Sequence, residues 1–262
     1  MDAERNASIR FTALSALFDA TTQRHLAHRG VTPGWRCLEV GGGGGSIARW
    51  LAERVGPGGQ VVATDVDTRF LETIELPNVE VRRHDITCDS LPDQTFDLIH
   101  ARMVLMHLPA RDQVLSRLRN ALKPGGWLVC EEFDRVSAPP DADLSSGEIV
   151  LKTHAAMGRV HHDQDVGPQY GRLLFGRLRG MGFIDLGAEA RLVMVQAGSW
   201  SARLLRASYE RRRRAMIDAG YVTAQEFDAD LARMEAVDFM APSPLMWSVW
   251  GRRPWEGPCA SS

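Results

Sequence analysis

A run of five glycines, residues 41–45, constrains this chain more than any other feature. It follows a short apolar segment, 36–40, and precedes residues 46–55, whose apolar side chains recur with the spacing of an amphipathic helix. Gly56 and Pro57 end that helix. An ordinary strand–helix turn needs only one or two glycines. Five in a row predict a backbone that a ligand approaches closely, at a helix N-terminus that favours a negative group such as a carboxylate.

The spacing of these glycines argues against a dinucleotide loop. The dinucleotide pattern G-x-G-x-x-G needs a third glycine five residues after the first. In each possible register another residue occupies that position, namely Ser46, Ile47 or Ala48. The run is not followed by a P-loop lysine either, so phosphate binding is not supported.

Short β-rich segments alternate with helical segments in the first half of the chain. Strands are expected at 36–40, 60–65, 79–85, 96–101 and 126–132, with a turn at 122–126, and helices at 46–55, from about Asp67 and from Pro109. This alternation predicts a parallel sheet covered by helices on both faces, and right-handed crossovers make it doubly wound. The ligand crevice of such an α/β fold lies at the carboxyl ends of the strands.

After Glu132 this alternation gives way to longer segments. We expect a linker at 137–143, a helix at 166–182, a strand at 190–195, a helical insert at about 200–237 and a buried strand at 244–251. Capping-box spacing, which marks helix starts, occurs at Ser145 with Glu148 and at Thr223 with Glu226.

Composition narrows the functional class. The 262 residues contain 31 lysines and arginines against 33 aspartates and glutamates, and this balance excludes a broadly basic nucleic-acid coat. The four cysteines are scattered without metal-ligand spacing, which is typical of a reducing compartment. No apolar run approaches the roughly 20 residues that span a bilayer, and the start has no signal-peptide pattern. We therefore expect a cytoplasmic protein without a metal or a membrane segment.

The glycine run carries a family resemblance. Glu39-x-Gly41-x-Gly43-x-Gly45 resembles the first motif of class I S-adenosyl-L-methionine (SAM)-dependent methyltransferases, an acid followed by alternate glycines at a strand–helix junction. The order of elements is also similar, over about residues 30–135. The resemblance implies a Rossmann-like, doubly wound, mostly parallel sheet of seven strands with helical lid insertions. It implies SAM as the cofactor and S-adenosyl-L-homocysteine as its product.

The same resemblance implies a division of the chain. Residues 1–30 form an N-terminal helical cap, and residues 31–135 form the SAM-binding core. Residues 136–262 complete the sheet and carry lid insertions at about 140–165 and 199–237.

Within the core, the resemblance assigns Gly41 and Gly43 to the methionine part of the cofactor, and Glu39 to the loop or to the amino group. Asp65 ends the second expected strand, where a carboxylate can accept hydrogen bonds from both ribose hydroxyls. Nicotinamide enzymes place an acid similarly, so Asp65 indicates a ribose-bearing ligand rather than one particular cofactor. Helix capping is the alternative, and we assign that role to Asp67.

Three residues are assigned to adenine by the resemblance. Asp85 follows the third strand and meets the exocyclic amine, while Ile86 packs beside the ring and offers its N–H. Val66 supplies a second apolar wall. A solvated turn aspartate is the alternative interpretation of Asp85.

The loop after the fourth strand completes the expected cofactor site. Ala101 and Arg102 face the crevice, and similar proteins hold the methionine amino group with the backbone of this loop. His107 is counted with this set, either in contact with the substrate or, as we prefer, bracing the loop. Glu131, Glu132 and Asp134 leave the fifth strand nearby and either steer a substrate or are solvated.

Catalytic residues are harder to recognise. An oxygen or nitrogen acceptor usually loses a proton, and His154 and His161 are the candidate bases, although a solvated polar stretch is the favoured alternative. The run 210–215 contains four adjacent arginines, which cannot share one helix face. We interpret it as a solvated helix surface rather than an RNA site.

These observations predict a SAM-dependent methyltransferase that acts on a small molecule, such as a secondary metabolite or a quinone-like compound. The roughly 100 residues beyond the core favour an enclosed acceptor pocket. Two alternatives stay open: a SAM-binding protein without methyl transfer, and a methyltransferase of nucleic acid or protein. The attacking atom and the oligomeric state also stay open, with a homodimer among the options.

Overall fold

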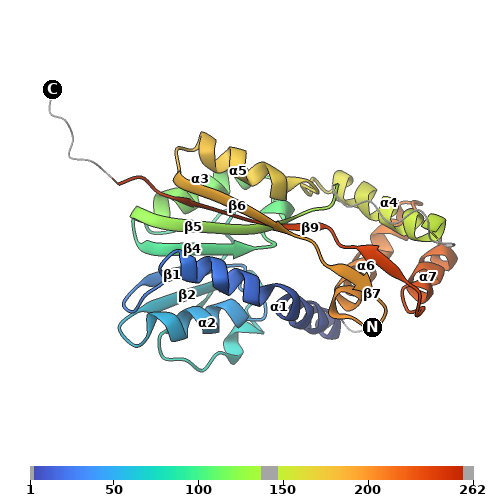
Figure 1. Cartoon of the computed structure of the whole chain (residues 1–262), viewed down its shortest axis with the longest axis horizontal. Coiled ribbons are helices and arrows are strands. Elements are labelled where there is room, and N and C mark those ends of the chain that lie inside the picture. Colours follow the sequence, from blue (N-terminus) through green and yellow to red (C-terminus); the bar gives the residue numbers. More distant parts are fainter. Residues whose placement is uncertain (1–2, 137–146, 256–262) are drawn as a thin grey trace. The chain divides into compact units, whose positions relative to one another are not determined.

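The computed structural model describes residues 3–136 and 147–255 (Figure 1). The helices are α1 Ala3–His28, α2 Ser46–Val55, α3 Arg111–Ala121, α4 Gly147–Asp163, α5 Tyr170–Gly180, α6 Trp200–Asp218 and α7 Ala224–Arg233. The strands are β1 Arg36–Val40, β2 Gln60–Asp65, β3 Val79–Arg83, β4 Phe96–Arg102, β5 Leu122–Asp134, β6 Ile184–Arg191, β7 Met194–Gln196, β8 Met240–Pro242 and β9 Leu245–Arg252. Two single-turn 3-10 helices, η1 Leu71–Thr73 and η2 Leu105–His107, follow β2 and β4.

The chain divides into two compact units. Of the described residues, the sheet unit consists of 20–132, 170–190 and 247–255. The helical unit consists of residues 3–19, 133–136, 147–169 and 191–246. Among the residues described, no helix has the length and apolar character needed to cross a bilayer, and no cluster of three potential metal ligands occurs.

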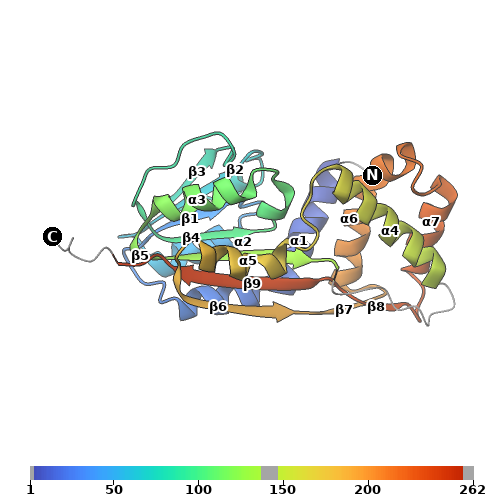
Figure 2. The same ribbon diagram turned by 90° about the horizontal axis from the view of Figure 1, so that it is seen from above.

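The seven-stranded sheet has the order β3-β2-β1-β4-β5-β9-β6. β1 pairs in parallel with β2 on one side and with β4 on the other, so that Glu39 lies opposite both Ala63 and His100. The direction of winding reverses between β1 and β4, and α2 lies on one face of the sheet with α3 and α5 on the other (Figures 1 and 2). The mostly parallel, doubly wound sheet is confirmed, and its switch point between β1 and β4 is where such folds bind ligands.

The periodicity of α2 explains how it covers the sheet. Ile47, Leu51 and Val55 recur along one helix face, and each is 2 % exposed or less. They pack in one cluster with strand residues such as Val61 and Leu98. This buried apolar face fixes the helix start, and therefore the glycine loop before it, against the ends of the strands.

The helical unit has its own core. Helices α4, α6 and α7 group together in Figure 2, and β7 and β8 form a two-stranded antiparallel sheet. Their shared cluster contains Met157, Tyr209 and Phe227. The capping box predicted at Thr223 and Glu226 is confirmed at the start of α7.

Local expectations differ from the structure in two places in the first half of the chain. The turn predicted at 122–126 is instead the beginning of β5. There Gly125 donates its N–H to the carbonyl of Arg253, and Arg253 donates its own to the carbonyl of Gly126, so pairing overrides the local turn signal. The helix expected from about Asp67 is reduced to η1.

The second half also departs from expectation. The predicted insert at 200–237 is two helices, and the strand expected at 190–195 is parts of β6 and β7. Most of β6 was missed because its apolar residues alternate with polar residues and glycine instead of forming a continuous apolar run. The expected linker at 137–143 and the capping residue Ser145 lie outside the described residues.

Candidate functional site

The glycine loop has the conformation that its sequence pattern predicts. Gly41, Gly43 and Gly45 have φ angles of 66°, 50° and 77°, in the left-handed region that side chains disfavour. Gly45 is the N-cap of α2 and provides no side-chain cap. The loop therefore presents main chain, rather than side chains, at the positive end of the helix.

The loop also packs closely against the chain after β4. A Cβ atom built on Gly41 would collide with the side chain of Val104. The carboxyl ends of β1 and β4 are thus in contact at the switch point of the sheet. Any larger residue at position 41 would displace one of these two loops.

Asp65 lies on this loop. Its carboxylate accepts the N–H of Gly43 at 3.0 Å and the N–H of Asp67 at 3.1 Å. The capping role predicted for Asp67 is wrong, because η1 begins after Phe70 and the Asp67 carboxylate pairs with Arg69 at 2.6 Å. The carboxylate of Asp65 accepts the N–H of Asp67, and the carboxylate of Asp67 accepts the N–H of Arg69. These two side-chain turns stand where a helix was expected.

Asp85 and its neighbours line the region after β3. Asp85 accepts hydrogen bonds from the N–H and the hydroxyl of Thr87, at 2.9 and 2.6 Å, and these bonds lower the pKa of its carboxyl. Ile86 is buried, whereas Val66 after β2 is 59 % exposed. Val66 therefore offers an uncovered apolar surface beside Asp65.

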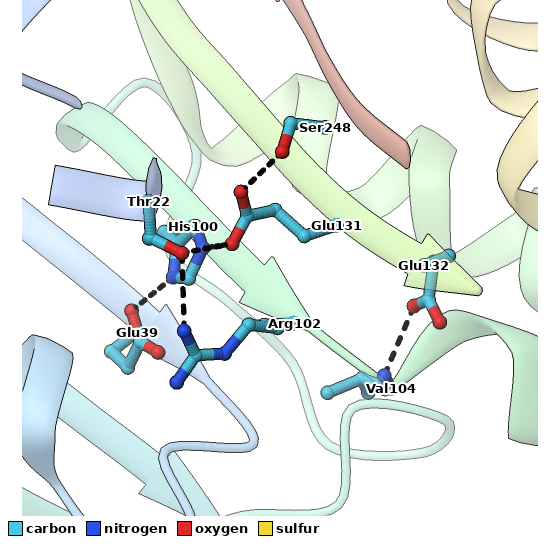
Figure 3. A network of polar contacts seen from close by, with 8 residues as sticks. All are labelled: Thr22, Glu39, His100, Arg102, Val104, Glu131, Glu132 and Ser248. Atoms are coloured by element: carbon cyan, nitrogen blue, oxygen red, sulfur yellow. Dashed lines mark hydrogen bonds and ion pairs between the residues drawn. The ribbon is translucent and has the colours of Figure 1, made fainter. Parts of the chain in front are cut away.

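A buried polar network joins β1, β4 and β5 (Figure 3). His100 Nδ1 lies 2.7 Å from a carboxylate oxygen of Glu39, and His100 Nε2 lies 3.4 Å from Glu131. None of these three residues is more than 3 % exposed. Thr22 of α1 and Ser248 of β9 donate hydroxyl hydrogen bonds to the two oxygens of Glu131.

The charges in this network balance one another. Burial alone lowers the pKa of His100, but Glu39 and Glu131 outweigh it and raise that pKa to about 9. Burial alone raises the pKa of Glu131, while His100, Arg102 and Ser248 lower it to about 2. At neutral pH the network is therefore an imidazolium between carboxylates, which fixes the strand ends beneath the glycine loop.

Glu132, the next residue on β5, holds the loop after β4. Its carboxylate accepts the N–H groups of Val104 and Leu105, at 3.0 and 2.6 Å, where η2 begins. Burial raises the pKa of Glu132 to about 8. Just before these residues, Met103 adopts a φ of 60°, a conformation uncommon for a residue with a side chain. Such outliers persist only where the surroundings fix them.

The structure brings the predicted cofactor residues to one unit. Glu39, the glycines, Asp65, Val66, Asp85, Ile86, Ala101, Arg102 and His107 all belong to the sheet unit. Ala101 is fully buried, and Arg102 donates a hydrogen bond to Thr22 at 3.1 Å. His107 ends η2.

The two candidate bases lie on α4 of the helical unit. His161 is 3 % exposed. His154 is half-buried, and burial together with the nearby charge of Arg135 lowers its pKa. His154 is therefore a neutral imidazole at physiological pH.

Sequence reasoning missed part of the site. His100, Thr22 and Ser248 were not singled out, and the solvated alternative for Glu131 and Glu132 is wrong because both are buried. One signal was present in the sequence: two acids end a segment whose other residues are apolar. A buried acid needs a partner, and in this chain the partners come from segments far away in sequence.

Residues 38–128 match a family model described as a methyltransferase domain. This match, the strand order and the glycine loop confirm the predicted resemblance to class I SAM-dependent methyltransferases over this part of the chain.

Two curated relatives carry the name ubiquinone/menaquinone biosynthesis C-methyltransferase UbiE. The chain is 31 % identical over 161 residues to the protein of Bordetella avium (strain 197N), and 34 % identical over 164 residues to that of Laribacter hongkongensis (strain HLHK9). Each match covers 53 % of this chain, and they cover 63 % and 66 % of the relatives. The chain thus spans just under two thirds of their length.

A solved structure shares the fold across most of the chain. It is phosphoethanolamine N-methyltransferase 2 of Haemonchus contortus, in complex with phosphomonomethylethanolamine and S-adenosylhomocysteine. The TM-score is 0.56 at 19 % sequence identity, over 90 % of this chain and 53 % of the other. At this identity the likeness concerns the fold.

Proposed function

We propose that this chain is a SAM-dependent methyltransferase that acts on a small-molecule acceptor, with quinone-like compounds as the first candidates. The observation that carries the proposal is the glycine loop, residues 41–45, at the switch point of the sheet, where the carboxylate of Asp65 accepts the N–H of Gly43. We call this loop the glycine cradle. The names of the two curated relatives support the quinone-like class of acceptor.

The residues present fit SAM better than a phosphate ligand. The amide of Gly43, which a phosphate would use, already donates to Asp65. The resulting negative charge on the loop disfavours a pyrophosphate and favours a cationic ligand. The cradle at Gly41 and the exposed side chain of Val66 provide a close backbone approach and an apolar surface for a flat ring.

We assign roles to individual residues on this basis. Gly41 and Gly43 would line the methionine part of the cofactor, and Asp65 would accept the ribose hydroxyls. Asp85, Ile86 and Val66 would hold the adenine.

The loop after β4 would complete the cofactor site. Ala101, Arg102 and His107 belong to that loop and to the strand end before it. Glu39 is bonded to His100, so we propose that it supports the glycine loop rather than the amino group. The segments at about 140–165 and 199–237 remain our candidates for the acceptor.

When bound, SAM supplies a methyl group that its positively charged sulfur already activates. The task of the chain is then to hold the donor and acceptor in line, and orientation of this kind contributes about 7–11 kcal/mol. If the acceptor must lose a proton, the neutral imidazole of His154 can accept it, with His161 as the second candidate.

Cofactor binding tests the first part of the proposal. Calorimetry with S-adenosylhomocysteine should show affinity about 10- to 100-fold weaker in Asp65→Ala, because a charge-assisted contact is lost. Asp67→Ala is the matched control, since that exposed carboxylate pairs with Arg69, and it should bind like the wild type. Equal affinity in Asp65→Ala would contradict the ribose assignment.

Transfer tests the second part. The protein is incubated with methyl-labelled SAM and a panel of quinols, phenols, amines and carboxylic acids. Label should appear in a quinol or phenol product. Tight cofactor binding without transfer to any member of the panel would favour a SAM-binding protein without this activity.

A further inference from the structure

The helical unit contains an arginine cluster without counter-ions. Arg10 of α1, Arg135 after β5, and Arg211 and Arg212 of α6 are electrostatic neighbours. None of these four side chains forms an ion pair with a carboxylate in the part of the chain that the structure describes. We refer to these four residues as the arginine cluster.

Nearby arginines behave differently. Arg213 pairs with Asp228 at 3.2 Å, and Arg214 pairs with Asp218 at 3.3 Å. The prediction of a solvated, acid-flanked helix surface therefore suits these two members of the run 210–215. Arg211 is likewise exposed, whereas Arg212 is half-buried and donates a hydrogen bond to Oε1 of Gln164 at 2.7 Å.

The nearest acid in sequence is already engaged. Glu210 accepts hydrogen bonds from Arg206 at 3.0 Å and from Asn6 at 3.4 Å. Neither contact involves a member of the arginine cluster. Glu210 therefore does not act as the direct partner of Arg211 or Arg212.

Two of the cluster guanidinium groups are also incompletely hydrogen-bonded. The Nε atoms of Arg10 and Arg135 are shielded from solvent and have no hydrogen-bond partner in the described residues. Burial, followed by the charges of Arg211, Arg135 and Arg212, lowers the pKa of Arg10 to about 10. A buried donor without an acceptor and several unopposed like charges are both unfavourable, and an anionic ligand would relieve both.

Arg135 connects the cluster to a pocket. The pocket is open to solvent, its cavity volume is about 30 Å³, and its walls are largely apolar. They include Leu17, Phe18, Phe133, Leu204 and Ser208, together with Arg135.

Arg10 and Arg212 lie on the same helix faces as two residues that line this pocket. Arg10 precedes Leu17 by seven residues, which is about two turns of α1 and returns to the same face. Arg212 follows Ser208 by four residues, about one turn of α6. Arg135 is the charged residue among those that line the pocket, and Arg10 and Arg212 lie one to two helix turns beyond its walls.

We propose that this pocket binds a small apolar molecule through its anionic group, a carboxylate or a phosphate, with Arg135 as the principal partner and Arg10 and Arg212 beside it. A guanidinium matches both groups by paired hydrogen bonds. This assignment rests on the proposed function. It implies that the methyl acceptor is a molecule with an apolar body and an anionic group.

Three fluorescent probes that share one ring system test the assignment. They are 2-naphthoate, 2-naphthyl phosphate and the neutral 2-naphthamide, each titrated into the full chain. At least one of the two anions should bind about tenfold or more tightly than the amide. Whichever anion has this advantage identifies the group that the pocket recognises. Equal affinities for all three would overturn the proposal.

Variants assign the preference to the cluster. Arg135→Gln and, separately, Arg10→Gln should reduce the anion preference at least several-fold. Arg214→Gln removes an exposed arginine that pairs with Asp218, and it should leave the preference unchanged. If both Arg135→Gln and Arg10→Gln still bound the anionic probe more tightly than the neutral amide, the proposed site would be refuted. If Arg135→Gln does not fold, the Arg10→Gln variant alone decides the question.

Binding of S-adenosylhomocysteine to the same variants separates the two proposals. It should be unchanged in Arg135→Gln. If the anion preference is present while S-adenosylhomocysteine does not bind even the wild type, the proposed function fails and the anion site stands. If S-adenosylhomocysteine binds and no anion preference exists, the anion site fails alone.

Discussion

His100 on β4 and Glu39 on β1 lie directly opposite each other in the sheet and share a contact of 2.7 Å in the interior of the sheet unit. Glu39 is two residues before Gly41, the first left-handed glycine of the cradle. The pair therefore anchors the strand from which the cradle begins. Because an isolated buried charge is costly, each partner requires the other.

Replacing His100 should consequently destabilise the whole sheet unit. His100→Gln leaves Glu39 and Glu131 as buried carboxylates without a cation between them, and breaking such a pair costs about 3–5 kcal/mol. Urea unfolding of this variant measures the loss. His28→Gln, at an exposed position near the end of α1, is the control and should change the stability by less than about 0.5 kcal/mol. A similarly small change in His100→Gln would show that the network contributes little.

The same histidine predicts how stability depends on pH. The pKa of His100 is raised from 6.5 to about 9 in the folded protein. The folded state therefore keeps a proton that the unfolded state releases, so its stabilisation is complete below pH 6.5 and is lost as pH rises through about 9. The decline is at most about 1.4 kcal/mol per pH unit for one proton. Urea unfolding between pH 8 and 9 should show it in the wild type and not in His100→Gln.

Glu132 affects the stability over a different, lower pH range. Its pKa is raised from 4.5 to about 8, so its contribution is present below pH 4.5 and is lost as pH rises toward 8. Glu132→Gln keeps an acceptor for Val104 and Leu105 without the charge. Its stability should match that of the wild type within about 1 kcal/mol at pH 4.5, where both side chains are neutral in the folded state, and the decline between pH 4.5 and 6.5 should disappear.

Glu132→Ala is the matched test of the hydrogen bonds themselves. It leaves the two buried N–H groups without an acceptor and should be about 1–3 kcal/mol less stable than Glu132→Gln at every pH. Thermal unfolding of both variants at pH 5 and pH 8.5 distinguishes the charge from the hydrogen bonds. If the Gln and Ala variants were equally destabilised, the loop after β4 would not depend on this acceptor.

Local patterns predicted those elements that local physics determines. Residues 46–55 match α2 because a strong apolar period coincides with a glycine cap at each end. Thr223 and Glu226 form the predicted capping box because that motif lies within one turn of chain. In contrast, β5 extends through residues 122–126 because of pairing with Arg253, a residue far away in sequence.

The site divides in the same way. The glycine cradle was predictable because the required φ angles restrict the residue type, and Asp65 because it ends an apolar strand. The partnership of His100 with Glu39 was not, because strand order and register bring them together and neither is visible in local sequence. The arginine cluster likewise joins residues from three separate segments.

The cradle itself gives the sharpest prediction. Gly41→Ala forces a side chain into the left-handed region at φ 66° and into the side chain of Val104, so it should cost about 1–3 kcal/mol of stability and weaken S-adenosylhomocysteine binding at least tenfold. Gly58→Ala is the control, because no atom lies within 4 Å of the added Cβ and its φ is ordinary. Calorimetry and thermal unfolding of both variants measure the two effects. Wild-type binding in Gly41→Ala would mean that the cofactor does not approach the backbone at this glycine.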